Sequence, residues 1–177
     1  NYITHYLSFM FAAIKAARRH PGKFDIIWAS SPPLFTGIAG MAIAWLKKAR
    51  FCLDIRDIWP ESAVVAGQIK ADSMMFRMAK IVEYVLYKAA ARITCVARPM
   101  AEYIRQVSGG KQPEIIYNAI PETMTAKEAL PIEQNPAQLN ILYIGNMGYC
   151  QNLSLVIEAA AILAARGESR IRFQLVG

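Results

Sequence analysis

The 177-residue sequence predicts an α/β fold, with a doubly wound parallel sheet and helices on both of its faces. Short apolar runs bounded by turn residues alternate with helical patterns, as in repeated βα units. Runs such as FDIIWA (24–29), apolar at every position except Asp25, are typical of parallel strands buried on both sides. Hydrophobic residues make up 55% of the chain, enough for one substantial core.

The first expected element is a helix over 2–19, which ends in a cationic turn before Pro21-Gly22. A strand over 24–29 follows. Serine is a good N-cap and proline suits the first turn, so Ser30-Ser31-Pro32-Pro33 is expected to cap a helix that continues to about Lys47. RFCLDI (50–55) is the next expected strand.

Asp72 or Ser73 is expected to cap a helix that continues to about Ala90. Its apolar positions, spaced by four and three residues, are Met75, Ala79, Val82, Leu86 and Ala89. The remaining expected elements are a strand at 91–97, a helix at 99–107, a strand at 113–120, a strand at 139–145, a helix at 152–166 and a strand at 170–176. The proline-containing polar stretch between them predicts a first domain at 1–120, a linker at 121–138 and the start of a second domain at 139–177.

The net charge and the length of the apolar stretches limit the kinds of molecule that the chain is expected to bind. A net charge of +7 suits nucleic acid, anionic lipid or phosphorylated substrates, but the chain has no Lys/Arg-rich run and no nucleic-acid motif. The longest apolar stretch, 32–46, is shorter than the ~20 residues that a membrane span requires. We therefore expect a cytoplasmic protein that does not bind nucleic acid. The absence of an initiating Met and the final strand IRFQLVG lead us to expect an excerpt of a longer protein.

Metal and disulfide chemistry are not expected. Cys52, Cys95 and Cys150 lie far apart, and the first two, in strands, are predicted to be small buried hydrophobes. The two histidines, His5 and His20, are remote from the acidic residues, so no metal site is predicted.

Ligands of such folds bind at the carboxyl ends of the strands. The candidate residues there are Ser30, Ser31, Arg56, Asp57, Arg98, Asn118, and the loop Gly145-Asn146-Met147-Gly148. The serines could cap a helix, as favoured above, or bind a phosphate or a sugar. The loop before the helix near Asn152 could face an anion or could be only a tight turn. No GxSxG or Walker pattern is present.

The stretch FCLDIRDIWPES (51–62) raises the possibility of a catalytic carboxylate pair. Residues three apart on a strand point to opposite faces, which argues against pairing Asp54 with Asp57. We expect Asp54 to be structural and paired with an arginine, whereas Asp57 lies at the strand end where a site belongs. Trp59-Pro60 is expected to be a packed turn. The apolar first helix is expected to pack in the core, with a membrane surface as the alternative.

Five stretches occur in a familiar order: FDIIWASSPP, LDIRDIWPES, ARITCVARPMAEYI, EIIYNAIPE and ILYIGNMGYCQNLSLVIEAAAIL. Together they resemble the bacterial group 1 (family 4) glycosyltransferases, above all those that build capsule, O-antigen or colanic-acid-type polysaccharides, including fucosamine transferases. The resemblance implies a GT-B fold of two Rossmann-like domains. It also implies transfer of a sugar from a nucleotide-diphosphate donor, with retention and without a metal or other cofactor.

The resemblance also implies roles for individual residues. Gly145, Asn146 and Gly148 match the loop that lies against the donor diphosphate, while Asn146 and Gln151 stand where many members carry Arg and Lys. Arg56-Asp57 matches a His-Asp pair that faces the sugar. Asp57 is therefore the strongest active-site candidate, and Arg56, which cannot act as a base, is expected to orient the site or bind phosphate.

These observations favour part of a retaining glycosyltransferase, inactive as an isolated fragment because half of the donor site is missing. Its partners would be a nucleotide-sugar donor and a lipid-linked or oligosaccharide acceptor, with peripheral contact at the inner membrane face. Two alternatives stay open: a nucleotide-sugar 2-epimerase of similar fold, and a non-catalytic nucleotide- or partner-binding α/β module.

Overall fold

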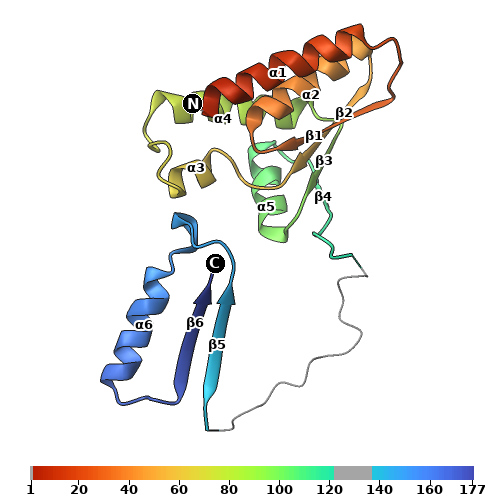
Figure 1. Ribbon diagram of the computed structural model, residues 1–177. Helices are drawn as coiled ribbons and strands as arrows, with labels where there is room; N and C mark the ends of the chain where they lie inside the picture. The colour runs from red at the N-terminus through yellow and green to blue at the C-terminus, as the bar shows by residue number, and fades with distance from the viewer. Residues whose placement is uncertain (1, 122–136) are drawn as a thin grey trace. The chain divides into compact units, whose positions relative to one another are not determined.

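The computed structural model describes residues 2–121 and 137–177. The chain divides into two compact units, Asn1–Ala119 and Ile120–Gly177 (Figure 1). The division falls one residue before the expected end of the first domain, and most of the expected linker lies outside the described residues. Parallel strands flanked by helices confirm the predicted α/β class.

The first unit carries a parallel sheet with the strand order β1-β2-β3-β4. Right-handed crossovers in one direction place the connecting helices on one face of such a sheet. In chain order the elements are α1 (Tyr2–Arg19), β1 (Ile26–Ser31), α2 (Leu34–Lys47), β2 (Arg50–Ile55), α3 (Glu61–Val65), α4 (Met74–Ala89), β3 (Arg92–Cys95), α5 (Arg98–Val107) and β4 (Glu114–Ile115).

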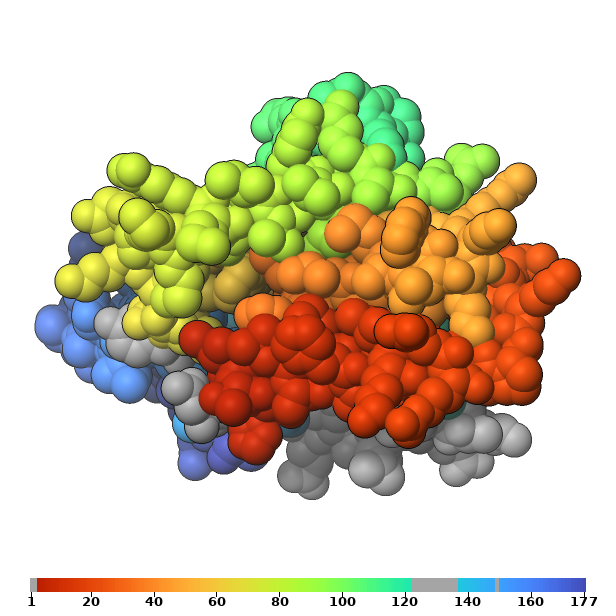
Figure 2. All heavy atoms as spheres, turned by 90° about the horizontal axis from the view of Figure 1, so that it is seen from above, coloured from red at the N-terminus to blue at the C-terminus, as the bar shows by residue number. Residues whose placement is uncertain are grey.

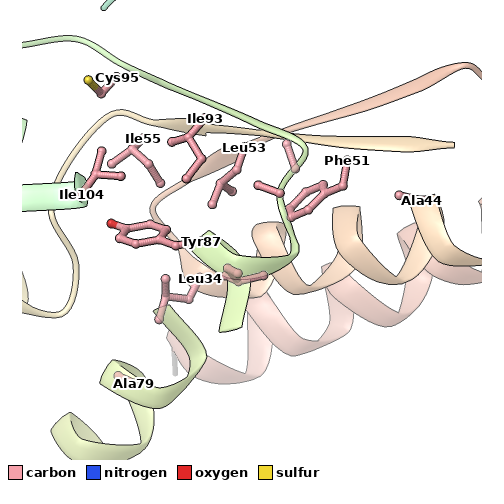
Figure 3. Close-up of a cluster of buried hydrophobic side chains, with 13 residues drawn as sticks. Leu34, Ala44, Phe51, Leu53, Ile55, Ala79, Tyr87, Ile93, Cys95 and Ile104 are labelled. Atoms are coloured by element: carbon pink, nitrogen blue, oxygen red, sulfur yellow. The ribbon is translucent and has the colours of Figure 1, made fainter. Parts of the chain in front are cut away.

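The core lies between this sheet and the helices α2, α4 and α5 (Figure 3). From the sheet come Phe51, Leu53 and Ile55, and from the helices Leu34, Leu86, Tyr87 and Ile104, all nearly inaccessible to solvent. The opposite face carries Ile26 and Trp28, which are 55% and 58% exposed. The sequence predicted helices on both faces of the sheet. Within residues 2–121, the core helices α2, α4 and α5 pack on one face of it.

The predicted serine cap of α2 is wrong. β1 begins and ends two residues later than expected, so Ser30 and Ser31 lie within the strand and pair with Asp54 and Ile55 of β2. The residue at the N-cap position is Pro33, which has no side-chain group to accept a hydrogen bond. The strand continues because its neighbour β2 offers a full ladder of backbone partners.

The cap of α4 is confirmed, since the Ser73 hydroxyl accepts a hydrogen bond from the Phe76 N–H at 3.1 Å. Its predicted buried face is confirmed at Ala79, Val82 and Leu86 but not elsewhere. Met75 is 45% exposed and Ala89 is also exposed, whereas Glu83 and Tyr87 are buried. The short helix α3 was not expected. Apolar spacing alone therefore missed both an element and a buried acid.

The predictions for the cysteines and for the Trp59-Pro60 turn are largely confirmed, whereas the prediction for the first helix is not. Cys95 is buried and Cys52 half-buried, as expected of strand cysteines, and Cys150 is exposed. Trp59 packs against the core and Pro60 is buried, which confirms a packed turn. Core burial of α1 is wrong for most of that helix: Met10 is buried, but Phe9 and Phe11 are 56% and 64% exposed.

The second unit contains the βαβ arrangement expected from the sequence. β5 (Leu139–Ile144) pairs in parallel with β6 (Ile171–Val176), and between them lie the 3₁₀ turn η2 (Tyr149–Gln151) and α6 (Ser154–Ala165). Among the described helices of both units, none combines the length and the apolar character that crossing a membrane would require.

Helix α2 packs so closely on strand β1 that a side chain at Gly40 is expected to destabilise the fold. A Cβ at Gly40 would lie 2.4 Å from the Ala29 Cβ, where two backbones must separate, so Gly40→Ala should destabilise the fold by about 2 kcal/mol. Gly37→Ala is the matched control, because its Cβ would meet the movable Leu86 Cδ1 at 2.8 Å. Alanine also gains helix propensity at both positions, so Gly37→Ala should stay within ~1 kcal/mol of the parent. Equal midpoints of the two variants in urea unfolding would contradict this packing.

Candidate functional site

A row of polar side chains crosses the sheet of the first unit near its carboxyl edge. The register places Ser30 of β1 beside Asp54 of β2, and Asp54 beside Thr94 of β3. Residues in register on neighbouring strands share a face, so both hydroxyls can reach the central carboxylate. Ser30 donates to Asp54 Oδ2 at 3.2 Å and Thr94 donates to Asp54 Oδ1 at 2.7 Å. Asp54 is only 6% exposed.

Arg56 extends this row toward the edge of the sheet. Its Nη1 lies 3.7 Å from Asp54 Oδ2, and its Nη2 donates to Asn118 Oδ1 at 2.5 Å. The arginine expected as a partner of Asp54 is therefore the residue directly after β2, two positions further along the chain. Because Asn118 follows β4, the guanidinium links the end of β2 to the far side of the sheet. The Arg56 side chain remains 51% exposed and can contact a ligand.

The structure thus brings three of the predicted residues together, Ser30, Arg56 and Asn118, around Asp54. Ser31 is not among them: it points to the opposite face, is 1% exposed, and accepts a hydrogen bond from the Arg56 N–H only through its backbone carbonyl, at 2.7 Å. Thr94 was missed by the sequence reasoning. Its place opposite Asp54 in the predicted parallel strands was the signal that could have found it.

Asp57 and Arg98 are exposed at the same edge, after β2 and at the start of α5. Neither side chain makes a hydrogen bond or ion pair with another described residue. The carboxylate of Asp57 can therefore accept hydrogen bonds from sugar hydroxyls, and the guanidinium of Arg98 can bind an oxyanion. Within residues 2–121 and 137–177, no three His, Cys, Asp or Glu side chains lie close enough together to hold a metal ion.

The other predicted residues, Gly145, Asn146, Gly148 and Gln151, lie in one loop of the second unit. The Tyr143 hydroxyl donates to the Asn146 carbonyl at 2.7 Å, and the Gln151 N–H donates to the Gly148 carbonyl at 3.2 Å. A Cβ at Gly148 would lie 2.8 Å from Gln151 Oε1, the end of a flexible side chain that can move aside. The loop therefore presents amide groups of Asn146 and Gln151 within a compact turn after β5.

Two comparisons with known proteins bear on this site. A family model described as "Glycosyl transferase 4-like domain" matches residues 3–119, nearly the whole first unit. The chain is also 22% identical over 167 residues to a protein of Pseudomonas aeruginosa named "Probable glycosyltransferase WbjE". That match covers 88% of this chain and 40% of the relative, so the chain spans less than half the length of that protein.

The polar row predicts that substitutions of Asp54 and Asp57 have different effects on the free energy of unfolding. Asp54→Asn keeps the side chain's shape but leaves one hydroxyl facing an amide N–H₂ group and weakens the pairing with Arg56. We expect a loss of about 2 kcal/mol in unfolding free energy. Asp57→Asn, at an exposed position on the same segment, should change it by less than ~0.5 kcal/mol. Chemical denaturation of both variants measures this, and an equal effect at the two positions would contradict the assigned geometry.

Proposed function

Because the chain belongs to the glycosyl transferase 4-like family, we propose that it forms the acceptor-side domain and the start of the donor-binding domain of a retaining glycosyltransferase. The enzyme transfers a sugar from a nucleotide-diphosphate donor to a lipid-linked or oligosaccharide acceptor in surface polysaccharide synthesis, without a metal or other cofactor. The observation that supports this most is the polar row at the carboxyl edge of the sheet, with Asp57 left free beside it.

In this proposal the residues of the first unit orient the sugars. Asp57 accepts a hydrogen bond from a sugar hydroxyl. Arg56 cannot act as a base, and it stays positively charged beside that acid. Asp54 and Asn118 hold the guanidinium in place, so it is preorganised for an oxyanion such as a phosphate.

The second unit would bind the donor. Transfer breaks the bond between the anomeric carbon and the diphosphate and forms one to the acceptor oxygen, whose proton goes to the departing diphosphate. Negative charge therefore builds on the leaving group. Amide donors in the loop after β5, including Asn146, Gly148 and Gln151, can stabilise that charge. Since Asn146 and Gln151 are uncharged, further cations outside this loop would complete the site.

A transfer assay on the full-length protein tests the role of Asp57. Asp57→Ala should lower kcat/KM by about 100-fold through lost transition-state contacts, without a change in thermal stability. Asp25→Ala is the matched control, because Asp25 is an exposed acid at the opposite end of the sheet and should retain full activity. Undiminished transfer by Asp57→Ala would remove Asp57 from the site. Conversion of the donor without an acceptor would indicate a 2-epimerase instead.

Peripheral contact with an anionic membrane is the second part of the proposal. α1, α2 and α4 together contain one acidic residue, Glu83, and it is 0% exposed. The same helices carry exposed cations at Lys15, Arg18, Arg19, Arg77 and Lys88. They also carry large apolar side chains that are more than half exposed: Phe9, Phe11, Trp45, Met74, Met78 and Ile81.

These helices fill the face of the first unit seen in Figure 2, α1 in red, α2 in orange and α4 in yellow-green. Near the end of α1 a shallow hollow is lined by Phe11, Ile14, Lys15, Arg18 and Arg19. A surface that combines apolar side chains with cations and exposes no acid on its helices is complementary to anionic lipid.

Vesicle flotation with a matched pair of charge reversals tests this surface. Lys15→Glu with Arg18→Glu should weaken binding to phosphatidylglycerol-containing vesicles at least ~10-fold, since each surface cation contributes about 1 kcal/mol. Arg166→Glu with Arg172→Glu changes the net charge equally but lies on the second unit, and should bind nearly as well as the parent. Equal losses in both variants would indicate attraction by net charge alone. Vesicle binding that is unchanged at high salt, or that is equally strong without anionic lipid, would also count against the proposal.

A further inference from the structure

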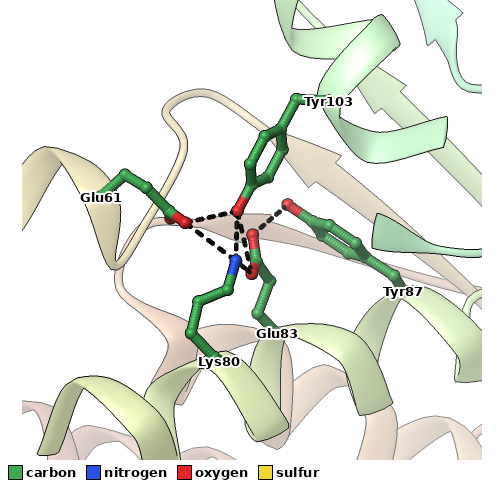
Figure 4. Close-up of polar contacts among 5 residues, drawn as sticks. All are labelled: Glu61, Lys80, Glu83, Tyr87 and Tyr103. Atoms are coloured by element: carbon green, nitrogen blue, oxygen red, sulfur yellow. Dashed lines mark hydrogen bonds and ion pairs between the residues drawn. The ribbon is translucent and has the colours of Figure 1, made fainter. Parts of the chain in front are cut away.

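Five polar side chains from α3, α4 and α5 form a network away from the polar row (Figure 4). The Lys80 ammonium donates to Glu61 Oε1 at 2.8 Å, and also to Glu83 Oε2 and the Tyr103 hydroxyl. The Tyr103 hydroxyl lies 2.7 Å from Glu61 Oε1, to which it donates. Tyr87 donates to Glu83 Oε1 at 3.0 Å.

The Glu83 carboxylate and the Lys80 ammonium of this network are both occupied by hydrogen bonds to its other members. Glu83 is 0% exposed, and both of its carboxylate oxygens accept hydrogen bonds. All three ammonium protons of Lys80 are used. Burial raises the pKa of Glu83 despite the neighbouring ammonium. Burial also acts to raise the pKa of Glu61, but the hydrogen bonds from Lys80 and Tyr103 outweigh it and leave that pKa lowered.

Stability is a weak explanation for such a network. Removing charges from water costs free energy, and apolar residues of similar volume often replace buried ion pairs without loss. What the network does achieve is geometric: it joins three helices at fixed side-chain positions. One of them, α3, has only five residues, too few to persist without tertiary contacts.

Glu61 is the first residue of α3 and follows Asp57 by four positions. The Ser62 N–H donates to the Ile58 carbonyl at 2.9 Å and the Val64 N–H to the Pro60 carbonyl at 3.2 Å, so this segment and α3 form one backbone unit. At the other end, the Arg56 N–H is held by the Ser31 carbonyl at 2.7 Å. The exposed Asp57 therefore lies between an anchor on the sheet and an anchor on the network.

We propose that the Glu61–Lys80–Tyr103–Glu83 network is a positioning device that fixes α3 and thereby sets the direction of the Asp57 side chain. Glu61, Lys80 and Tyr103 are positioning residues, with no contact to the sugars, and Glu83 is their buried support. The consequence for catalysis rests on the proposed function, whereas the mechanical link from Tyr103 to residues 56–66 does not.

The test removes a single hydroxyl. Tyr103→Phe deletes the hydrogen bonds of that hydroxyl with Glu61, Lys80 and Glu83, and keeps the ring that packs against the core. Tyr84→Phe on α4 is the matched control, since that tyrosine is 46% exposed and its hydroxyl makes no bond in the network. Hydrogen exchange measured on the full-length protein should be faster in residues 56–66 for Tyr103→Phe than for the parent, and unchanged for Tyr84→Phe. Glu61→Gln, which keeps an acceptor for Tyr103, should fall between Tyr103→Phe and the parent.

A measurement of sugar transfer distinguishes a loss of positioning from a loss of folding stability. Tyr103→Phe should lower kcat for sugar transfer about 10-fold, as expected of a misdirected catalytic group, with donor KM and melting temperature close to those of Tyr84→Phe. Unchanged exchange in residues 56–66 would overturn the positioning role, and so would faster exchange with an unaltered kcat. If the parent shows no transfer at all but Tyr103→Phe still loosens 56–66, the proposed function fails and the positioning link stands.

Discussion

The carboxyl edge of the first unit depends on one buried carboxylate. Asp54 is 6% exposed, in a position where an ionised group without partners would be very costly. Hydroxyls from the two flanking strands and the Arg56 guanidinium provide those partners. Because they come from β1, from β3 and from the residue directly after β2, the carboxylate ties three strand ends together. Through Arg56 and Asn118 it also reaches the segment after β4.

This arrangement follows from the register. A shift of one residue between β1 and β2 would turn Ser30 away from Asp54 and point it toward the core. The apolar residues on the other face oppose such a shift, since Phe51, Leu53 and Ile55 must all face α2, α4 and α5. The core therefore fixes the register, and the register assembles the polar row. The hydrophobic packing and the candidate site are two faces of the same three strands.

Much of this could be predicted from the sequence. The alternation of apolar runs with helical patterns predicted the βα units, and the odd spacing of Asp54 and Asp57 predicted separate roles for them. Ser31 was misplaced because Pro32-Pro33 suggests an early helix start, while the backbone pairing with β2 extends the strand. Glu83 was missed because apolar periodicity cannot identify a buried acid. Two of its partners, Lys80 and Tyr87, lie on the same helix, and the third, Tyr103, lies twenty residues away on α5.

The stretch from Asp54 to Glu61 shows how context assigns different chemistry to similar residues. Its three carboxylates lie within eight positions, yet each has a different set of partners. Asp54 is saturated by hydroxyls and a guanidinium, and Glu61 is held by an ammonium and a phenol. The partners of Glu61 all reach Oε1, and its Oε2 is buried without a hydrogen bond to a described residue. Each of these two acids fixes one end of the segment between them. Asp57, with no partner among the described residues, keeps all of its accepting capacity for a ligand, at a position that its two acidic neighbours hold in place.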